Sequence, residues 1–383
     1  MSAFNNREGY LLMEHSWKNV PKLGFGLMRL PMLGDKVDIE QFKVMADRFL
    51  EAGFTYFDTA YGYINGQSEA AFKEAVIKRH PRESFTIATK LPAWAGPKNA
   101  EEAKQMFWTS LERTGAGYFD FYLLHNVSES RKKVFDEYGI WDFVQERKKE
   151  GLIKHAGFSF HDTADVLDKV LTEHPEMDFV QLQINYADWE SGSVQSRLCW
   201  ETARKHGKPV VIMEPVKGGT LANLPEEVQK PFRDGGLEPV EAALRFAASL
   251  DGVITVLSGM STLEQMEQNL KFMKPFRPLD DRERGLIDQA LEALKARPGI
   301  PCTACKYCEK GCPQNIAISQ VFAARNTERV YGDPNGAKMA YRLALMQGGR
   351  PSGCVACGQC ERACPQKIRI IDELKNAVMD YED

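Results

Sequence analysis

The sequence has no apolar run of the roughly 20 residues that a transmembrane helix needs. Its first residues, MSAFNNREGY, have no apolar stretch preceded by positive charge, which predicts no secretory leader. Basic residues are not in excess, because 49 Lys and Arg stand against 53 Asp and Glu, for a net charge of −4. The composition therefore predicts a cytoplasmic protein with neither a membrane nor a nucleic acid as its partner.

Cysteine is almost absent from the first 300 residues. Cys199 stands alone there in a predicted helix and is expected to serve packing. The other eight of the nine cysteines lie in two tight clusters after residue 300. In a chain without a secretory leader, such clusters are typical of metal ligands in a reducing compartment rather than of disulfides.

No Gly-rich dinucleotide fingerprint follows the first predicted strand, which disfavours a doubly wound open sheet, the alternative fold. The chain instead alternates strand-like runs with helix-sized segments. The predicted strands are Leu23–Met28, Thr55–Thr59, Phe85–Lys90, Phe119–His125, Lys154–Ser159, Phe179–Asn185, Pro209–Glu214 and Gly252–Gly259. Eight such units predict an α/β fold, a (β/α)8 TIM barrel. Leu221–Glu238 is expected to be a loop.

The length of 383 residues exceeds the roughly 250 that a barrel needs, so we expect a small second domain. One more helix is predicted over Asp280–Arg297, with Asp280 or Asp281 near its N-cap and Pro298–Gly299 ending it. The expected organisation is an N-terminal extension (1–22), the barrel with this extra helix (23–299) and a ferredoxin-like domain (300–383).

Both cysteine clusters have the spacing C-x2-C-x2-C-x3-C-P of bacterial ferredoxins. The first three thiolates of a run, separated by two residues each, bind one iron–sulfur cube, and the fourth usually binds the other cube. We therefore expect two 4Fe–4S clusters, one on Cys302, Cys305, Cys308 and Cys364 and the other on Cys354, Cys357, Cys360 and Cys312. Structural zinc is the alternative for a thiolate tetrad.

The stretch between the two cysteine runs is longer than the linker of small ferredoxins. It contains two helix-like segments, Ile318–Arg329 and Ala337–Gln347. This part of the chain resembles the helical dicluster ferredoxins that sit inside larger redox enzymes. The second domain is therefore expected to be mostly helical.

Titratable side chains gather where three successive strands of the predicted barrel end. Asp58 lies at the end of the second strand and Tyr63 just after it, Lys90 ends the third, and His125 ends the fourth. Active sites of barrels lie at the C-terminal ends of the strands. Each residue alone could be a structural histidine or an ion pair, but four of them at three neighbouring strand ends favour an active site.

With these four residues the chain resembles the aldo-keto reductases, over nearly all of residues 20–275. Further matching segments are Gly66-Gln67-Ser68-Glu69, Gly157-Phe158-Ser159, Gln183-Ile184-Asn185-Tyr186, and Gly259-Met260-Ser261 through Glu264, Gln265 and Asn269. Together with the C-terminal cysteines, this is similar to the ferredoxin-containing subgroup of that family. The resemblance implies a catalytic tetrad of Asp58, Tyr63, Lys90 and His125.

In this tetrad Tyr63 is the implied general acid for carbonyl reduction. A phenol of pKa near 10 is a weak acid at neutral pH. The Lys90 ammonium is expected to lower that pKa, and Asp58 to hold Lys90 in place. His125 is expected to orient the carbonyl and to donate a hydrogen bond to the developing oxyanion.

The resemblance also implies a bound NADPH or NADH. Ser159 and Gln183 would bond the nicotinamide carboxamide, and Met213 occupies the place of the family's ring-stacking aromatic residue. The other implied cofactor contacts are Met28, Arg29, Asp58, Gly259, Ser261, Gln265 and Asn269. Because Gly259–Asn269 contains no Lys or Arg, we expect only a weak preference for NADPH. Arg29 could bind a cofactor phosphate or an acidic substrate, or form a surface ion pair.

The sequence thus predicts an oxidoreductase that reduces a carbonyl, or oxidises an alcohol, with nicotinamide and alongside iron–sulfur electron transfer. Hydride transfer moves two electrons and a cluster moves one, so a mediating flavin, a substrate radical and purely structural clusters all stay open. The alternative function is a redox-sensing or electron-transfer module whose barrel binds nucleotide with little turnover. The expected partners are a small carbonyl or alcohol substrate and an electron-carrier protein.

Two expectations concern the pocket. Its walls should include Trp94, Asn126, Tyr186 and Trp189, which would suit an aromatic or apolar substrate. The extra helix over 280–297 would span about 27 Å, roughly the height of a barrel. Running along the barrel wall, it would bring Cys302 to the catalytic face, so that the clusters cap the pocket; packing on the opposite face is the alternative.

Overall fold

The computed structural model of the chain describes residues 20–382, so most of the expected N-terminal extension lies outside the described residues. The chain forms two compact units. The first runs through residue 190 and adds 194–215 and 244–279; the second comprises 191–193, 216–243 and the chain from 280 onward. The domain boundary expected near residue 299 stays a prediction. No helix in the described range is long and apolar enough to cross a membrane.

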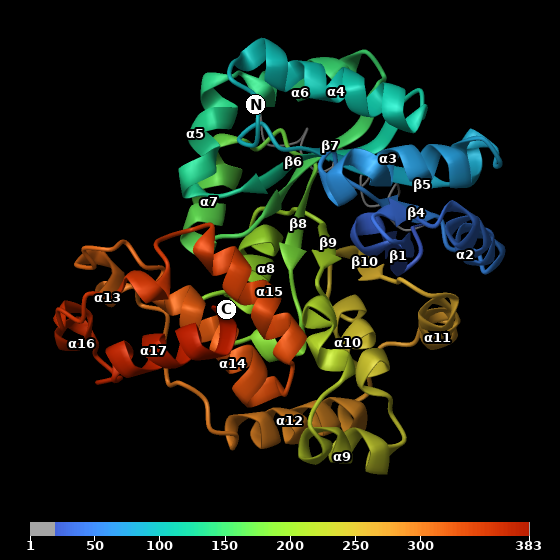
Figure 1. Cartoon of the computed structure of the whole chain (residues 1–383). Helices are drawn as coiled ribbons and strands as arrows, with labels where there is room; N and C mark the ends of the chain where they lie inside the picture. The colour runs from blue at the N-terminus through green and yellow to red at the C-terminus, as the bar shows by residue number, and fades with distance from the viewer. Residues whose placement is uncertain (1–19, 383) are drawn as a thin grey trace, which may run out of the picture. The chain divides into compact units, whose positions relative to one another are not determined.

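The first unit contains a closed barrel of eight parallel strands (Figure 1). Its strands are β1 (Leu23–Gly26), β4 (Tyr56–Asp58), β5 (Thr86–Leu91), β6 (Phe119–Val127), β7 (Ile153–Phe160), β8 (Phe179–Gln183), β9 (Val210–Met213) and β10 (Val253–Gly259). Gly24 of β1 pairs with Leu257 of β10 on one side and with Tyr56 of β4 on the other, which closes the ring. The predicted (β/α)8 barrel is therefore confirmed, and the open sheet is wrong.

The strands read as apolar runs because both of their faces are covered. Inside the ring, Tyr56, Phe121, Phe179 and Ile254 belong to one cluster of buried side chains. Glycine is required at one point of this wall, because a Cβ on Gly157 would lie 2.5 Å from the carbonyl oxygen of Phe179 on the next strand. The close approach of β7 to β8 brings the ends of these two strands together.

Helices and short elements connect the strands. The helices of this unit are α2 (Ile39–Glu51), α3 (Gln67–Phe72), η3 (Lys73–Ile77), α4 (Ala100–Thr114), α5 (Glu129–Glu137), α6 (Ile140–Lys149), α7 (Ala164–Glu173), α8 (Ser196–Lys205) and α11 (Leu263–Met273). The shorter elements are η1 (Leu27–Arg29), β2 (Met32–Leu33), β3 (Lys36–Val37), η2 (Tyr63–Gly66), η4 (Arg82–Ser84) and η5 (Tyr186–Asp188). The chain passes between the units within α10 (Pro239–Ala248).

Two strands end earlier than the sequence predicts. The first strand stops at Gly26, and Leu27–Arg29 forms the turn η1 instead. β8 stops at Gln183, and Asn185 caps the turn η5, its side chain accepting a hydrogen bond from the backbone N–H of Asp188. Capping turns of this kind compete with strand pairing for the backbone at the ends of strands.

The second unit is helical. It contains α9 (Glu226–Gly235), α12 (Asp281–Lys295), α13 (Tyr307–Lys310), α14 (Ile318–Tyr331), α15 (Pro334–Leu345), α16 (Gln359–Ala363) and α17 (Ile370–Tyr381), with the turns η6 (Lys217–Ala222) and η7 (Pro351–Gly353). α12, α14 and α15 confirm three predicted helices. Asp280 caps α12, its side chain bonding the backbone N–H of Glu283 while Glu283 bonds back, as the sequence predicted for this end.

The prediction of a loop over Leu221–Glu238 is wrong, because α9 fills most of that range. Pro231 lies inside this helix, where it removes a backbone hydrogen bond. Packing overrides this local cost: Val228 and Phe232 are fully buried, and Arg282 of α12 donates a 2.7 Å hydrogen bond to the carbonyl oxygen of Gly235. Tertiary contacts thus decide a helix that local sequence rules did not favour.

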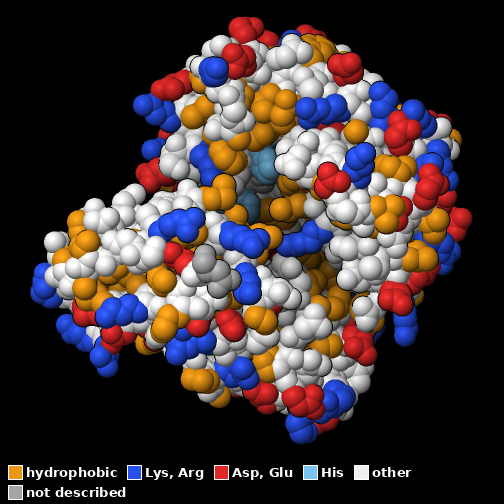
Figure 2. Space-filling view, viewed as in Figure 1, with side chains coloured by type: hydrophobic (Ala, Val, Ile, Leu, Met, Phe, Trp, Pro, Cys, Tyr) orange, Lys and Arg blue, Asp and Glu red, His pale blue; other side chains and the backbone are white. Residues whose placement is uncertain are grey.

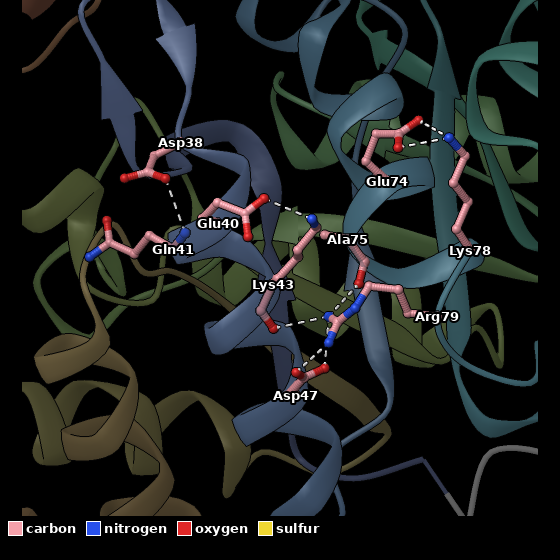
Figure 3. A network of polar contacts seen from close by, with 9 residues as sticks. All are labelled: Asp38, Glu40, Gln41, Lys43, Asp47, Glu74, Ala75, Lys78 and Arg79. Atoms are coloured by element: carbon pink, nitrogen blue, oxygen red, sulfur yellow. Dashed lines mark hydrogen bonds and ion pairs between the residues drawn. The ribbon is translucent and has the colours of Figure 1, made fainter.

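A polar network joins α2 to the segment after η3 (Figure 3). Arg79 donates to both carboxylate oxygens of Asp47 at 2.9 and 2.6 Å. At the start of α2, the Asp38 carboxylate accepts a hydrogen bond of 3.0 Å from the backbone N–H of Gln41. This cap satisfies one of the N–H groups that the first turn of a helix leaves without a partner.

Asp38→Ala should weaken the first turn of α2 by about 1 kcal/mol, the usual contribution of an N-cap. The amide hydrogens of residues 39–42 should then exchange with solvent roughly 5-fold faster, as hydrogen–deuterium exchange would measure. Asp38→Asn is the control, because its side-chain oxygen keeps the acceptor. Equal exchange in wild type and Asp38→Ala would contradict the cap.

Candidate active site and cluster sites

The four predicted catalytic residues lie on neighbouring strands of the barrel. Asp58 ends β4, Lys90 lies near the end of β5, His125 near the end of β6, and Tyr63 begins the turn η2 after β4. β4, β5 and β6 are adjacent and parallel, so their C-terminal ends meet at one rim. The fold therefore brings together the residues that the sequence analysis singled out.

Lys90 and Asp58 form a buried ion pair at the centre of this group. The side chain of Lys90 is fully buried and that of Asp58 is 4% exposed. Lys90 Nζ donates to Asp58 Oδ1 and, at 2.8 Å, to the carbonyl oxygen of Thr59. Gln181 of β8 donates to the other carboxylate oxygen of Asp58 at 3.1 Å. The carboxylate thus has donors from two different strands across the barrel.

Gln181 was missed by the sequence analysis, which selected Gln183. In a strand these two side chains share one face, since residues two apart point the same way. Gln181 lies deeper and bonds Asp58, whereas Gln183 bonds His161. The signal that could have identified Gln181 is a polar residue inside an otherwise apolar, buried strand.

For each member of this ion pair, burial and the neighbouring charge shift the pKa in opposite directions. Burial disfavours the Lys90 ammonium, but the Asp58 carboxylate and Tyr63 outweigh it, and the pKa of Lys90 is raised. Burial also raises the pKa of Asp58, against the opposing effects of Lys90 and Gln181. Lys90 is therefore a fixed positive charge at the floor of the site.

Tyr63 lies between Lys90 and His125. Lys90 Nζ is 4.9 Å from the centre of the Tyr63 ring, and the His125 ring centre is 5.8 Å away at an interplanar angle of 80°. As expected, the Lys90 ammonium acts to lower the pKa of Tyr63, but it does not decide the net shift. Burial raises this pKa by more than the nearby Lys90 ammonium lowers it. The phenol therefore stays protonated at neutral pH.

His125 is neutral in this environment. Burial, followed by the charges of Lys90, His161 and Arg131, holds the pKa of His125 well below its usual range. Its backbone carbonyl accepts a hydrogen bond of 2.7 Å from the indole N–H of Trp94, while its buried Nδ1 has no hydrogen-bond partner within the described chain. Histidine side chains of this unit remain visible below hydrophobic neighbours on the face shown in Figure 2.

His161 is a second imidazole of the site that the sequence analysis missed. It follows β7 directly and is exposed to solvent. Loss of hydration around its imidazole, together with the charge of Arg131, still lowers the pKa of His161 to about 4. A hydrogen bond with Gln183 acts in the opposite direction and raises this pKa. No sequence pattern pointed to His161, because its approach to His125 depends on the pairing of β6 with β7.

Apart from Asp58, the predicted cofactor contacts lie in or directly after five consecutive strands of the ring: β7, β8, β9, β10 and β1. Ser159 lies in β7, Gln183 in β8 and Met213 in β9. The remaining residues are Gly259 at the end of β10, Ser261, Gln265 and Asn269 in and before α11, and Met28 and Arg29 in η1. They therefore occupy the part of the rim that the catalytic strands β4 to β6 leave free.

Some of these side chains already form hydrogen bonds with other groups of the protein. Ser261 Oγ donates to the carbonyl oxygen of Arg29 at 2.8 Å, and the Ser261 N–H donates to Gln265 at 2.8 Å, which ties η1 to the start of α11. Asn269 is buried and donates to Ser258 at 2.7 Å, so its side chain serves the fold. Met28 is 58% exposed.

Two buried polar atoms at this rim are available to bond a polar ligand. The Nδ1 atom of His125 and the Oδ1 atom of Asn126 are both buried and lack hydrogen-bond partners among the described residues. The backbone N–H of Asn126 donates to Ser159 Oγ at 2.7 Å. Unsatisfied buried polar atoms are uncommon in proteins and point to a ligand or water. The residues present therefore fit a ligand that can donate hydrogen bonds, as the carboxamide of a nicotinamide can.

The four residues expected to line the pocket separate into two pairs. Trp94 and Asn126 lie beside His125. Tyr186 and Trp189 pack instead against Phe246, with ring centres 6.2 and 5.4 Å away, and Tyr186 is 1% exposed. Trp94 and Asn126 thus lie beside a tetrad residue, and a role of Tyr186 and Trp189 in lining the pocket stays a prediction.

In the second unit, cysteines of the two runs lie in two mixed groups. Cys312, Cys354, Cys357 and Cys360 line one hollow, together with apolar side chains that include Ile318 and Leu374. The thiol of Cys302 interacts electrostatically with those of Cys305 and Cys364, and the thiol of Cys308 with those of Cys302 and Cys305. The fourth cysteine of each run thus lies with the first three of the other run, an arrangement that fits two cubes.

Cys199 stands apart from both groups. It is buried in α8 of the first unit, and burial raises the pKa of its thiol to about 12. A thiol with so high a pKa is unreactive at neutral pH. The packing role expected from the sequence suits this position.

Comparison with known proteins agrees with both parts of the chain. Residues 22–292 match the model of the aldo/keto reductase family, and residues 301–369 match that of the 4Fe-4S dicluster domain. An aldo-keto reductase of Mycolicibacterium vanbaalenii is 29% identical over 254 residues, which cover 66% of this chain and 82% of the relative. The NADH-specific methylglyoxal reductase of Escherichia coli is 24% identical, over 66% of this chain and 89% of its own.

Solved structures show the same fold. The holo form of an aldo-keto reductase from Bacillus halodurans superposes with a TM-score of 0.57 at 26% identity, covering 70% of this chain and 91% of that one. An aldo-keto reductase from Klebsiella pneumoniae in complex with NADPH gives a TM-score of 0.57 at 20% identity, covering 70% and 90%. With its barrel, its rim of titratable residues and a family model that spans most of its length, this chain belongs to the aldo/keto reductase family of oxidoreductases and carries a 4Fe-4S dicluster domain.

Proposed function

We propose that the barrel reduces a carbonyl compound, or oxidises the corresponding alcohol, with a bound nicotinamide. The observation that carries this proposal is the buried Asp58–Lys90 pair beside Tyr63 and a neutral His125. A proton donor, a fixed cation and a neutral hydrogen-bond donor around one point are what the reduction of a carbonyl needs. The hydride for this reaction would be supplied by a bound dihydronicotinamide.

In this mechanism the carbonyl oxygen lies against the Tyr63 hydroxyl and the His125 imidazole. The raised pKa of Tyr63 keeps its proton available until negative charge develops on the carbonyl oxygen. Tyr63 then gives up that proton, and the Lys90 ammonium stabilises the phenolate that forms. Asp58 and Gln181 fix Lys90, and the neutral His125 donates a hydrogen bond to the oxyanion.

The nicotinamide would lie on the rim formed by β7 to β10 and β1. Ser159 and Gln183 would face its carboxamide, and Met213 its ring. The absence of Lys and Arg from Gly259–Asn269 supports a weak preference between NADPH and NADH. Arg29, whose carbonyl oxygen accepts a hydrogen bond from Ser261, would be the cation that binds a cofactor phosphate.

In the second unit we propose two 4Fe–4S clusters with crossed ligands, one on Cys302, Cys305, Cys308 and Cys364 and the other on Cys354, Cys357, Cys360 and Cys312. Two such clusters would pass electrons singly to or from a carrier protein. Coupling them to the barrel would require a mediator such as a flavin or a substrate radical. The cysteine-lined hollow also supports the second candidate function, an electron-transfer module.

Tyr63→Phe removes the proton donor and keeps the ring. Turnover on a small aldehyde such as methylglyoxal should fall roughly 100-fold or more, the usual contribution of a general acid. The affinity for NADPH, measured by fluorescence titration, should stay the same. Tyr61→Phe, which changes a neighbouring tyrosine outside the tetrad, is the matched control. Wild-type turnover in Tyr63→Phe would refute the assignment.

Lys90→Met should affect both catalysis and stability. It leaves the Asp58 carboxylate buried without its cation, which costs about 3–5 kcal/mol. The double variant Asp58→Asn with Lys90→Met should recover part of this stability, because the uncompensated charge is gone, without recovering turnover. Thermal unfolding and turnover of the single and double variants would measure both effects. A double variant less stable than Lys90→Met would contradict the pairing.

Anaerobically purified protein should contain about eight irons and eight sulfides per chain, four of each per cube. Cys364→Ala and Cys312→Ala should each lose ligands of a different cluster and so give two distinguishable electron paramagnetic resonance spectra after reduction. Cys199→Ala should keep both clusters. Stoichiometric zinc without sulfide would refute the iron–sulfur proposal, and identical spectra from the two cysteine variants would refute the crossed ligands.

A further inference from the structure

A guanidinium group lies beside the proposed active site and has no role in the mechanism above. Arg131 stands in the first turn of α5, which follows the strand that carries His125. Its Cζ atom is 4.0 Å from the centre of the Trp94 ring, and the Trp94 indole N–H donates to the carbonyl oxygen of His125 at 2.7 Å. Arg131 is therefore one aromatic ring away from the backbone of a tetrad residue.

Arg131 makes no ion pair or side-chain hydrogen bond with any residue between 20 and 382. Its positive charge, like that of Lys90, lowers the pKa of the neighbouring His125 and His161 imidazoles, which stay neutral. Burial alone lowers the pKa of its guanidinium, with no carboxylate to oppose the effect. A half-buried cation without a counter-ion is unfavourable in a folded chain.

Other half-buried arginines of the barrel have acidic partners. Arg82 donates to Asp120 at 2.8 Å, and Arg113 lies 3.5 Å from Glu69. Arg113 also donates to the carbonyl oxygen of Tyr61 at 3.1 Å, close to the turn that carries Tyr63. Arg131 differs from both in having no acidic partner among the described residues, which suggests that its counter-ion comes from a ligand.

A second observation on the same strand points to a ligand. Asn126, directly after His125, has a backbone φ of 58°, and its Oδ1 atom is buried without a partner in the described chain. The Nδ1 atom of His125 is likewise unpartnered. A left-handed backbone at a non-glycine residue is strained and is found most often at functional positions. The end of β6 thus borders a place for a ligand beside a cation that has no acidic partner in residues 20–382; Asn126 Oδ1 can only accept a hydrogen bond there, so the anionic group itself would be bound by Arg131.

We propose that Arg131 binds an anionic group of the substrate, so that the preferred substrates are carbonyl compounds that carry a carboxylate or a similar oxyanion. The planar guanidinium matches a carboxylate through two parallel hydrogen bonds, and the Trp94 ring holds that plane in position. Arg131 follows β6 and lies outside the run of strands that carries the predicted nicotinamide contacts, which favours the substrate over the cofactor as its partner. The inference rests on the proposed carbonyl reduction.

A matched pair of aldehydes tests this inference. Wild-type holoenzyme should reduce 4-carboxybenzaldehyde with a KM well below that for benzaldehyde. Arg131→Met, which removes the charge and keeps much of the length, should raise the KM for 4-carboxybenzaldehyde roughly 10- to 100-fold, the loss of a charge-assisted pair of hydrogen bonds. The KM for benzaldehyde, kcat for both, and the affinity for NADPH should change little.

Two control variants separate a specific contact from a general field or a packing role. Lys133→Met removes a cation from the same helix, where Lys133 is 78% exposed and faces Glu137, and it should leave the preference for the acid unchanged. Arg131→Lys should restore part of it. A loss in Lys133→Met equal to that in Arg131→Met, or an equal rise of KM for both aldehydes in Arg131→Met, would overturn the inference.

Binding of a compound that cannot be reduced separates this inference from the proposed reaction. Benzoate should bind to the wild-type holoenzyme, as isothermal calorimetry would show, and bind at least 10-fold more weakly to Arg131→Met. That result supports the anion site even if neither aldehyde is turned over, in which case only the carbonyl reduction fails. Equal benzoate binding by both proteins, or a loss of NADPH affinity in Arg131→Met, would overturn the inference.

Discussion

The buried ion pair of Asp58 and Lys90 is the interaction on which the candidate active site depends. Neither charge would be tolerated alone inside the barrel, because an unpaired buried ion loses its hydration without compensation. Each therefore fixes the other, and donors from β5 and β8 converge on the carboxylate at the end of β4. The turn η2, which begins with Tyr63, leaves β4 just after this point, so the position of the proposed proton donor follows from the pair.

The charges around this pair make the site electropositive. Lys90 is a permanent cation, Arg131 is a second one beside Trp94, and His125 stays neutral because adding a third positive charge in this buried place would be unfavourable. Such an environment stabilises negative charge that develops on a substrate oxygen. The same field adds to burial, the larger effect, in disfavouring a charged His125 imidazole, and it favours an anionic ligand.

The second unit depends on a different constraint. Its core contains several cysteines packed among apolar side chains such as Phe322, Tyr341 and Leu374. A small helical domain of this kind buries limited apolar surface, and ligands that cross-link distant segments compensate for that. Crossed ligation would join the segment around Cys308 to that around Cys360, between which α14 and α15 are folded. How this unit lies against the barrel, and hence whether the clusters cap the pocket, stays a prediction.

The sequence by itself determined the features that depend on local order. Eight strand-like runs specified the barrel, the repeated cysteine spacing specified the cluster domain, and Asp58, Lys90 and His125 could be chosen because they end strands whose direction a barrel fixes. Only the tertiary structure decided what depends on neighbours distant in the chain. Gln181 in place of Gln183 at Asp58, the helix α9 in place of a loop, and the proximity of His161 to His125 all follow from packing between strands or helices distant in the sequence. The net rise of the Tyr63 pKa belongs here too, because burial and the charge of Lys90 oppose each other, and their balance depends on depth inside the folded barrel, which no run of residues encodes.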